Sequence, residues 1–309
     1  MPVTRPTRGG FAVAGSSLKK KAGRDTPSGL FHVNHIQVND PAIPSGYADR
    51  EGISTTMRPG CKGCREDQPD FAIAMAFQPI VDADTGLPFA FEALVRGKGG
   101  EGAAQVLAQV TPDNRYAFDQ QCRTAAIEGA VAAGILSTGA RLSINFLPNA
   151  VYSPVACIQA TLAAARTSAF PTDRLIFEFT ENEEMGDTDH VRNIVETYRA
   201  MGFATALDDF GAGHAGLGLL ANFQTDYLKL DMDLIRGIDV SVPRRLIVEG
   251  MVRIATSLGM DVIAEGIETP AEYAVLRDLG IRYIQGYLLA RPGFRVLPDI
   301  LLPATPLAA

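Results

Sequence analysis

No stretch of the 309-residue chain contains the roughly 18 consecutive apolar residues that a transmembrane helix needs. The N-terminus likewise lacks the apolar core and the cleavage site of a secretory signal. Only four cysteines are present, without the dense spacing of a disulfide framework, which fits a reducing compartment. We therefore expect a cytoplasmic protein with no transmembrane segment.

A surplus of basic residues is also missing. The chain has 28 Lys and Arg against 35 Asp and Glu, which gives a formal net charge of −7. Because proteins bind phosphate backbones through an excess of Lys and Arg, this balance excludes a general affinity for DNA, RNA or an anionic membrane. A phosphate-bearing ligand would need another source of positive charge.

The chain does contain enough apolar sequence for a large core, with 47% hydrophobic and 20% charged residues. Its length allows two domains or a single α/β barrel of ~200–250 residues. The first 70 residues differ from the rest, because basic residues cluster between Arg5 and Arg24 and Gly, Pro, Ser and Thr are frequent. We expect residues 1–70 to be a mostly disordered extension, either a solvated tail or a contact for a partner or membrane surface.

Two pairs of metal-binding residue types occur in this extension, His32 with His35 and Cys61 with Cys64. Four ligands of these kinds suit a tetrahedral zinc site, although their spacing matches no zinc-finger pattern. A CxxC redox pair and residues without a special role are the alternatives. The sequence leaves these three interpretations open.

From Phe71 onward, short β-prone runs alternate with helical segments. The expected strands are 71–82, 88–97, 141–147, 174–181, 203–211, 227–231, 261–268 and 283–290, and the clearest expected helices are 116–135, 187–201, 243–259 and 270–280. Repeated βα units favour a (β/α)8 barrel, of the TIM type, over 71–302, followed by a tail over 303–309. The first two strands are separated by too few residues for a helical crossover, so we expect a hairpin and one antiparallel strand.

Polar side chains occur inside these strands, where side chains alternate between the two faces. If Phe177 and Phe179 pack on helices, Glu178 points into the barrel. The same alternation puts Glu92 and Arg96 on one face of their strand, and Lys229 and Asp231 on one face of theirs. It also puts Asn145 on the face opposite its apolar neighbours. Five carboxylates then meet at one end of the barrel: Glu92, Glu178, Asp208, Asp209 and Glu265.

Any one of these acids could simply cap a helix or pair with a neighbouring base. Five together are too costly to bury unless protons or cations neutralise them. Carboxylate oxygens with an Asn carbonyl are ligands that Mg²⁺ and Mn²⁺ prefer, and these strands contain no Cys or His, which disfavours zinc. The sequence thus predicts a divalent-cation site at the end of the barrel where enzymes of this fold keep their active sites.

Eight short motifs follow one another in order: QPI (78–80), EAL (92–94), SIN (143–145), FEFTE (177–181), LDDFGAG (207–213), LKLD (228–231), AEGIE (264–268) and QGY (285–287). In this set and spacing the chain resembles the EAL family of cyclic-di-GMP phosphodiesterases, from about Phe71 to Pro292. The resemblance implies a barrel with one antiparallel strand, a homodimer formed through the barrel, and hydrolysis of cyclic di-GMP to linear pGpG in bacterial signalling, with two Mg²⁺ or Mn²⁺ ions per site.

The resemblance also implies roles for particular residues. Glu92, Asn145, Glu178 and Asp208 would hold one cation, and Asp208 and Asp209 the second. Lys229 and Glu265 would flank the attacking water, Lys229 by hydrogen bonding and Glu265 either as a ligand of the second cation or as a proton acceptor. Which of the two is the base stays open. Substrate contacts are implied for Gln78, Arg96, Asp231 and Gln285, the last also lying near the cations, and Glu181 would anchor the loop after Asp209.

That loop departs from the commonest family pattern, because His214, Ala215 and Gly216 stand where many members have Tyr-Ser-Ser. This difference bears on catalytic rate and on dimer coupling, and His214 is either incidental or a pH-sensitive regulator. Two functions remain open: an active phosphodiesterase, or a catalytically silent module that binds cyclic di-GMP or a protein partner. No sensor domain is recognisable in the first 70 residues, so we expect a stand-alone EAL protein.

Overall fold

The computed structural model describes residues 70–151, 153–180, 188–212 and 216–303. The chain divides into two units, Met1–Thr55 and Thr56–Ala309, and every described residue belongs to the second. The expected extension over residues 1–70, with its HxxH and CxxC pairs, therefore falls outside the described residues except for its last position. The three interpretations of those pairs stay untested.

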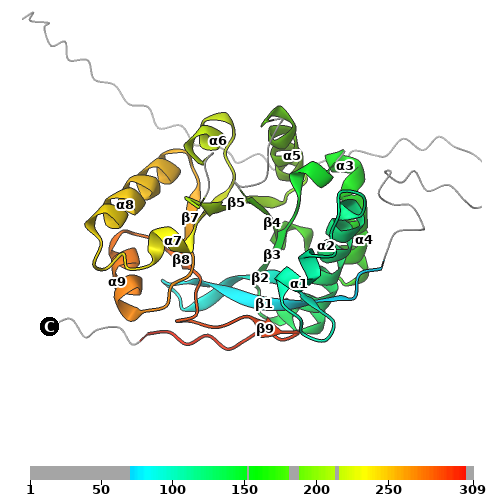
Figure 1. Cartoon of the computed structure of the whole chain (residues 1–309), viewed down its shortest axis with the longest axis horizontal. Helices are drawn as coiled ribbons and strands as arrows, with labels where there is room; N and C mark the ends of the chain where they lie inside the picture. The colour runs from blue at the N-terminus through cyan, green and yellow to red at the C-terminus, as the bar shows by residue number, and fades with distance from the viewer. Residues whose placement is uncertain (1–69, 152, 181–187, 213–215, 304–309) are drawn as a thin grey trace, which may run out of the picture. The chain divides into compact units, whose positions relative to one another are not determined.

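Eight strands form a closed barrel, which Figure 1 shows down its axis. In chain order they are β1 (Ile73–Asp82), β2 (Leu87–Gly97), β3 (Arg141–Asn145), β4 (Leu175–Thr180), β5 (Ala204–Phe210), β6 (Tyr227–Leu230), β7 (Asp261–Ala264) and β8 (Tyr283–Ile284). Strands β2 to β8 run parallel to one another, whereas β1 pairs antiparallel with both β2 and β8 and so closes the barrel. The predicted (β/α)8 fold with one antiparallel strand is confirmed.

Helices surround the barrel on its outer side (Figure 1). They are α1 (Ala103–Leu107), α2 (Arg115–Ala132), α3 (Pro154–Cys157), α4 (Gln159–Thr167), α5 (Thr188–Ala200), α6 (Gly216–Asn222), α7 (Met232–Ile235), α8 (Val242–Ser257) and α9 (Pro270–Asp278). The four helices expected from the sequence are present as α2, α5, α8 and α9. A short ninth strand, β9 (Gly293–Phe294), was not expected. It pairs antiparallel with Ala76 and Phe77 of β1, on the edge of β1 opposite β2, and the far end of that same edge (Val81 and Asp82) pairs with β8.

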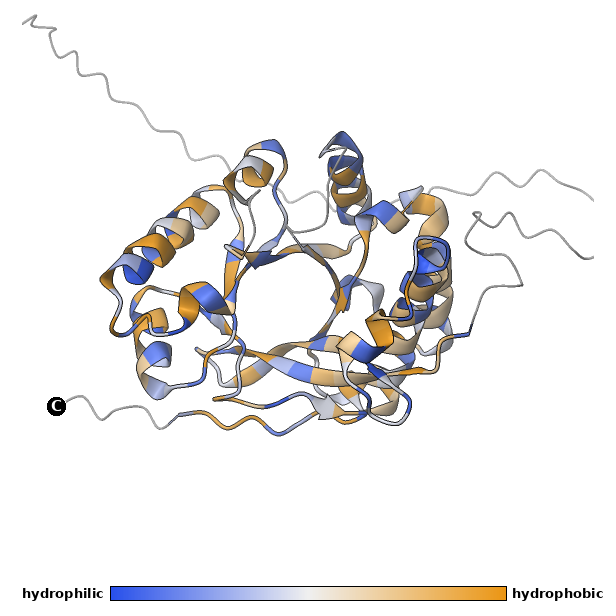
Figure 2. Cartoon of the chain, in the orientation of Figure 1, coloured by the Kyte–Doolittle hydropathy of each residue, from blue (hydrophilic) through white to orange (hydrophobic). Residues whose placement is uncertain are grey.

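The helices pack against the barrel through apolar side chains at every second strand position, because each strand turns one of its two faces outward. Phe177 and Phe179 of β4 are buried on this outer face among aromatic side chains, with the Phe177 ring 4.9 Å from Tyr198 of α5 and 5.3 Å from Phe203. Figure 2 shows hydrophobic colour on the strands and on stretches of the surrounding helices. None of the helices in the described ranges is long and apolar enough to cross a membrane.

The barrel interior contains an apolar layer with a polar layer above it. The apolar layer consists of Ile80, Phe89, Ala90, Ile176, Ala204, Ala206, Tyr227, Ile263 and Tyr283. Two positions further along these strands, where side chains return to the same face, lie Glu92, Glu178, Asp208, Lys229 and Glu265. The packed lower layer therefore forms the floor of a polar site at the carboxyl ends of the parallel strands.

Strand β5 breaks the regular alternation at Asp209. The register with β6 shifts between Leu207 and Phe210, and Asp209 adopts a φ of 53°, a left-handed conformation that costs a residue with a side chain free energy. Its N–H donates to Oδ1 of Asp208 at 2.9 Å. A regular strand would place Asp208 and Asp209 on opposite faces, whereas this irregularity brings both carboxylates to the same end of the barrel.

Gly266, directly after Glu265, allows a close approach between the end of β7 and α7. Its φ is 69°, and a Cβ atom there would lie 2.3 Å from Cβ of Met232. Any larger residue would both strain the backbone and push α7 away. This glycine therefore helps to set the position of Glu265.

Candidate active site

Lys229 occupies the centre of the polar layer and is fully buried. Its ammonium nitrogen lies 2.7 Å from Glu265, 2.9 Å from Asp208, 3.0 Å from Glu178 and 3.7 Å from Glu92. One positive charge thus faces four carboxylates, with Asp209 a fifth acid beside them. The convergence that the sequence predicts for these residues is present in the structure.

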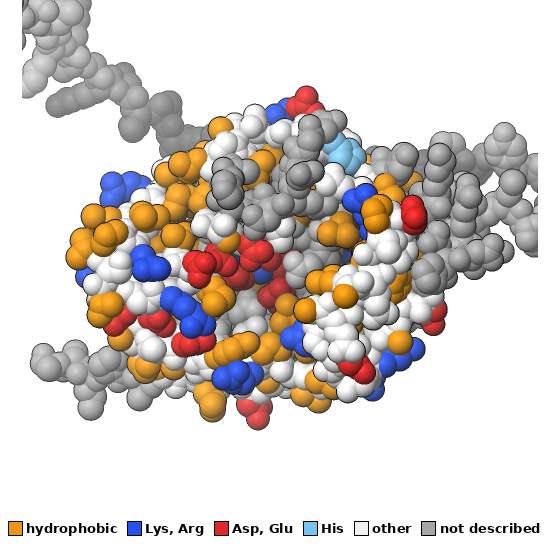
Figure 3. All heavy atoms as spheres, in the orientation of Figure 1, with side chains coloured by type: hydrophobic (Ala, Val, Ile, Leu, Met, Phe, Trp, Pro, Cys, Tyr) orange, Lys and Arg blue, Asp and Glu red, His pale blue; other side chains and the backbone are white. Residues whose placement is uncertain are grey.

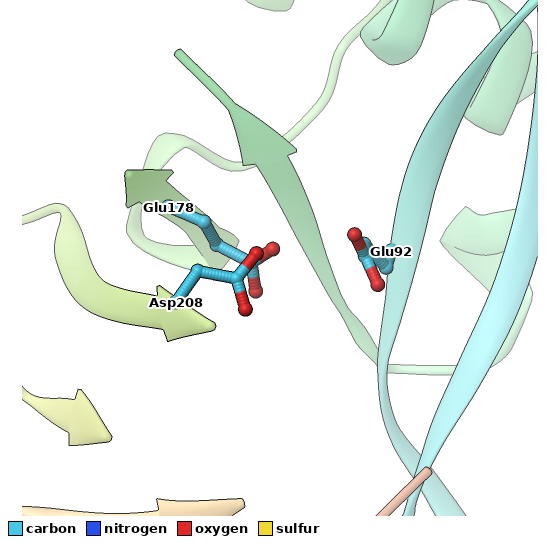
Figure 4. A group of neighbouring side chains, drawn as sticks. All are labelled: Glu92, Glu178 and Asp208. Carbon is cyan, nitrogen blue, oxygen red and sulfur yellow. The ribbon is translucent and has the colours of Figure 1, made fainter. Parts of the chain in front are cut away.

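Glu92, Glu178 and Asp208 form one compact group of carboxylates. Each offers an oxygen, and these oxygens all lie within 4.8 Å of one another. Figure 4 shows the three side chains pointing toward one another into the barrel from β2, β4 and β5. Asn145, at the end of β3, donates from Nδ2 to Glu92 at 3.1 Å, so its carbonyl oxygen is the atom it offers to a cation.

A second group shares Asp208 with the first. Oxygens of Asp208, Asp209 and Glu265 also lie within 4.8 Å of one another. Asp208 thus belongs to both groups, as expected of a residue that bridges two cations. Figure 3 shows acidic side chains gathered in the middle of this face of the protein.

Burial and mutual repulsion shift the pKa values of these acids. Burial raises the pKa of Glu178 to about 8, opposed by Lys229 and reinforced by Glu92 and Asp208. Burial and Asp208 likewise raise the pKa of Asp209 to about 6. Burial also raises the pKa of Glu265 well above its ordinary value. Burial raises the pKa of Asp208 as well. Four carboxylates in one site thus resist ionisation as long as no cation neutralises them.

Two members of the site are instead held in their charged forms. Burial opposes the ionisation of Glu92, but Lys229 and the hydrogen bonds from Gln285 and Asn145 outweigh it and lower the pKa of Glu92. Burial also disfavours the charged form of Lys229, yet the carboxylates around it raise its pKa well above the ordinary value. Lys229 is therefore protonated at neutral pH.

The donor set fits hard divalent cations. Five carboxylates and an amide carbonyl surround one ammonium group, so full ionisation of these acids leaves an excess of negative charge that cations can neutralise. All the ligand atoms that they offer are oxygens, as Mg²⁺ and Mn²⁺ prefer. Buried Oε1 of Gln285 has no hydrogen-bond partner among the described residues, although Nε2 of the same side chain donates to Glu92 at 2.8 Å. This unpaired carbonyl oxygen is an acceptor for a hydrogen bond from a water molecule bound beside a cation.

A cavity of about 240 Å³ lies over the two groups of acids. Its walls include Gln78, Asp231 and Gln285, three of the four residues for which the sequence predicts substrate contacts. Arg96, the fourth, is half-buried at the end of β2, donates to the Val95 carbonyl at 2.7 Å, and borders a different cavity. Among the described residues Arg96 forms no ion pair, and the cavity that it borders has Asn145 among its other wall residues.

Several residues in or beside the site were not predicted individually. Ser143 donates to Glu178 from the strand that carries Asn145, and it belongs to the SIN motif. Tyr287, Arg236 and Glu268 line the same cavity as Asp231, and Arg236 pairs with Glu268. Tyr287 belongs to the QGY motif and Glu268 to the AEGIE motif, so these motifs could have indicated both residues. Nothing in the sequence indicated Arg236. Glu181 and the His214–Ala215 segment lie outside the described residues.

Comparison with known proteins identifies the family. The EAL domain model matches residues 68–292. The blue light- and temperature-regulated antirepressor BluF of Escherichia coli (strain K12) is 33% identical over 229 residues, which cover 74% of this chain and 56% of BluF. The probable cyclic di-GMP phosphodiesterase PdeN of the same strain is 28% identical over 255 residues, covering 78% of this chain and 47% of PdeN. The chain thus spans about half the length of these curated relatives.

Two solved structures are similar in sequence and fold. A standalone versatile EAL protein from Vibrio cholerae O395, in its c-di-GMP-bound form, is 47% identical with a TM-score of 0.73, over 76% of this chain and 98% of that chain. BlrP1 of Klebsiella pneumoniae, in a manganese and cyclic-diGMP complex, is 34% identical with a TM-score of 0.67, over 74% of this chain and 58% of that chain. With the domain match over residues 68–292, these likenesses show that the chain belongs to the EAL domain family.

Proposed function

We propose that this chain is a metal-dependent phosphodiesterase that hydrolyses cyclic di-GMP to linear pGpG. The observation that carries the proposal is the pair of carboxylate groups that share Asp208 around Lys229. Similarity to PdeN, a probable cyclic di-GMP phosphodiesterase, and to two proteins solved in complex with c-di-GMP supports the same substrate.

The ligand sets follow from the two groups. Glu92, Asn145, Glu178 and Asp208 hold one divalent cation, Mg²⁺ or Mn²⁺, and Asp208 and Asp209 hold a second. When bound, such cations lower the pKa of water and neutralise the charge that develops on phosphoryl oxygens. The manganese in the BlrP1 complex supports this type of cation. The acidic composition is then compatible with a doubly anionic substrate, because cations supply the positive charge.

Lys229 and Glu265 divide the proton chemistry between them. Lys229 is held protonated by its four carboxylates, so it can donate a hydrogen bond to the attacking water but cannot accept a proton. Glu265, 2.7 Å from Lys229, borders the cavity and is the acceptor within reach. We assign the base role to Glu265 and the orientation of the attacking water to Lys229.

The substrate lies in the cavity above the acids. Gln78, Asp231 and Gln285 contact the nucleotide from its walls. Arg96, from the neighbouring cavity that Asn145 also borders, binds a phosphate of the substrate. Glu181 anchors the loop that follows Asp209.

The active unit is a homodimer formed through the barrel. Apolar side chains are exposed at the start of α8 and just before it: Val240 at 82%, Val242 at 65%, Leu246 at 61% and Ile247 at 50%. Adjacent exposed apolar residues of this kind mark interaction surfaces, and a second copy of the chain would cover them. The cytoplasm stays the predicted compartment on the basis of cysteine usage.

A second candidate is binding without hydrolysis. BluF is named an antirepressor, which supports a role in which the domain engages a partner and turnover is secondary. The two functions separate when the purified chain is mixed with cyclic di-GMP and Mn²⁺ or Mg²⁺ and the nucleotides are resolved by chromatography. Accumulation of pGpG supports hydrolysis, whereas nucleotide binding without product across a broad metal titration supports the binding module.

A further inference from the structure

A buried ion pair on α2 lies outside the group of acids around Lys229. Nη2 of Arg123 is 2.5 Å from Oδ2 of Asp119, and the side chains are 0% and 2% exposed. Within the described ranges Nε and Nη1 of Arg123 form no hydrogen bond of ordinary geometry, although the Tyr198 hydroxyl lies close enough to interact with the guanidinium. Buried ion pairs contribute little to stability when their desolvation is not fully repaid by hydrogen bonds. The pair therefore calls for a reason other than stability.

The second oxygen of Asp119 reaches the strand that carries a cation ligand. Oδ1 accepts a hydrogen bond from the backbone N–H of Leu147 at 3.0 Å. Leu147 lies two residues beyond Asn145, where β3 has ended, and the intervening Phe146 N–H donates to the Glu178 carbonyl at 2.9 Å. Asp119 thus holds the backbone at the point where it leaves the barrel next to Asn145.

A cavity of about 510 Å³ borders the same segment. Its walls include Asn145, Phe146 and Leu147 on one side and Asp119 and Phe118 on the other. Side-chain packing therefore leaves this side of the segment incompletely supported, in contrast to the dense packing of most interiors. The hydrogen bond that the Leu147 N–H donates to Asp119 is then a directional constraint on this side.

We infer that Asp119 is a positioning residue for the cation site. Asp119 holds the backbone of Leu147 and thereby the side-chain carbonyl of Asn145, and Arg123 orients Asp119. This inference rests on the proposed function, because it assigns Asn145 as a cation ligand. The side-chain amide of Asn145 donates a hydrogen bond from Nδ2 to Glu92. A shift of the Asn145 backbone therefore moves both its ligand atom, the side-chain carbonyl oxygen, and this hydrogen bond. Partners behind metal ligands typically contribute about 10–100-fold to metal affinity.

Two double variants of the full chain separate positioning from a general effect on folding. Asp119→Asn with Arg123→Met keeps an acceptor for Leu147 and leaves no unpaired buried charge. Asp119→Leu with Arg123→Met removes the acceptor and is otherwise matched. Gln120→Leu is the control on the same helix, since it removes a hydrogen bond to the Cys157 carbonyl, away from Leu147.

Mn²⁺ binding is measured by calorimetry, without nucleotide. The Asn variant and Gln120→Leu should bind within about threefold of the parent chain, and the Leu variant about 10–100-fold more weakly. Equal Mn²⁺ affinity of the Asn and Leu variants would overturn the inference. If the parent chain binds no Mn²⁺, the proposed cation site itself fails, and the inference with it.

Hydrogen exchange gives a second readout that needs neither metal nor the Leu variant. In the parent chain the Leu147 amide should exchange slowly, and in Asp119→Asn with Arg123→Met it should stay protected. A Leu147 amide that exchanges as fast as an exposed loop amide in the parent chain would show that Asp119 does not hold it, which contradicts the inference.

Discussion

The ammonium nitrogen of Lys229 lies 2.7 Å from a carboxylate oxygen of Glu265, although the two residues are 36 positions apart in the sequence. Strands β6 and β7 are adjacent and parallel. Lys229 near the end of β6 therefore lies beside Glu265, which directly follows β7. Three further carboxylates surround the same nitrogen. The charge of Lys229 is therefore the main counter-charge of the site whenever cations are absent.

Replacing this lysine tests that balance. Lys229→Met should destabilise the chelator-treated protein by about 3–5 kcal/mol, because it leaves buried carboxylates without a counter-charge. This corresponds to a decrease in Tm of about 10 °C. Mn²⁺ should raise the Tm of the variant more than that of the parent chain, and turnover should fall at least about 100-fold. Lys98→Met, on an exposed loop, is the control, and an unchanged Tm in chelator would refute the role of Lys229.

The raised pKa of Glu178, about 8, predicts a pH-dependent instability without metal. Because this pKa lies above the ordinary value of 4.5, the stability that Glu178 contributes is complete below pH 4.5 and is lost as the pH rises through 8. Glu178→Gln removes this dependence. In chelator, the Tm difference between Glu178→Gln and the parent chain should grow from pH 5 to pH 9, in favour of the variant. Glu196→Gln, an exposed acid on α5, should show no such trend, and a constant difference for Glu178→Gln would contradict the prediction.

A salt bridge supports the seam at which the barrel closes. Strands β1 and β8 share only the pairs Val81 with Ile284 and Asp82 with Tyr283, and Arg282 donates to both oxygens of Asp82, at 3.0 and 2.6 Å. The hydrogen bonds from Arg282 are the main cause that lowers the pKa of Asp82 to about 2.

The sign of this shift fixes the pH range of its effect. Since the pKa of Asp82 lies below its ordinary value of 3.8, the pair stabilises fully above pH 3.8 and loses its effect as the pH falls through 2. Arg282→Gln should therefore move the acid-unfolding midpoint to higher pH. Arg253→Gln, which breaks an exposed pair with Glu249 on α8, should leave the midpoint in place. Equal midpoints for the two variants would count against a role for Arg282 at the seam.

The exposed apolar residues of α8 predict the oligomeric state. Leu246→Glu places a charge in the proposed contact between two copies, where an unpaired charge is costly, and should convert a dimer to a monomer. Leu87→Glu, an equally exposed leucine at the β1–β2 turn, should leave the dimer intact. Light scattering after gel filtration measures both. A monomeric parent chain, or a dimer that Leu246→Glu leaves unchanged, would exclude this interface.

Much of this fold could be predicted because its signals are local. The short connection between the first two strands required a hairpin, and alternation in FEF identified which face of β4 enters the barrel. Glycines marked the ends of α5, α8 and α9. Shorter elements gave weaker signals, since α3 and α7 have four residues each and β9 only two, and tertiary contacts determine such segments.

The site was less predictable where the backbone leaves regular geometry. Period-two alternation puts Asp208 and Asp209 on opposite faces of β5. Their carboxylates meet in one group because of the left-handed φ of Asp209 and the register shift beside it, which the sequence pattern does not indicate. The contact from Asp119 to Leu147 joins α2 to the end of β3, and no sequence pattern indicates it. Both features arise from long-range packing.

The central claim is that the carboxylate site around Lys229, with divalent cations bound, hydrolyses cyclic di-GMP. The most direct measurement is pGpG formation in Mn²⁺ by the parent chain and by Glu92→Gln. Glu128→Gln is the control. Glu92 is buried between Asn145 and Gln285, whereas Glu128 is an exposed acid on α2. The account predicts pGpG from the parent chain and from Glu128→Gln, and a loss of at least about 100-fold in Glu92→Gln. Undiminished turnover by Glu92→Gln, or no turnover by the parent chain at any Mn²⁺ or Mg²⁺ concentration, would contradict it.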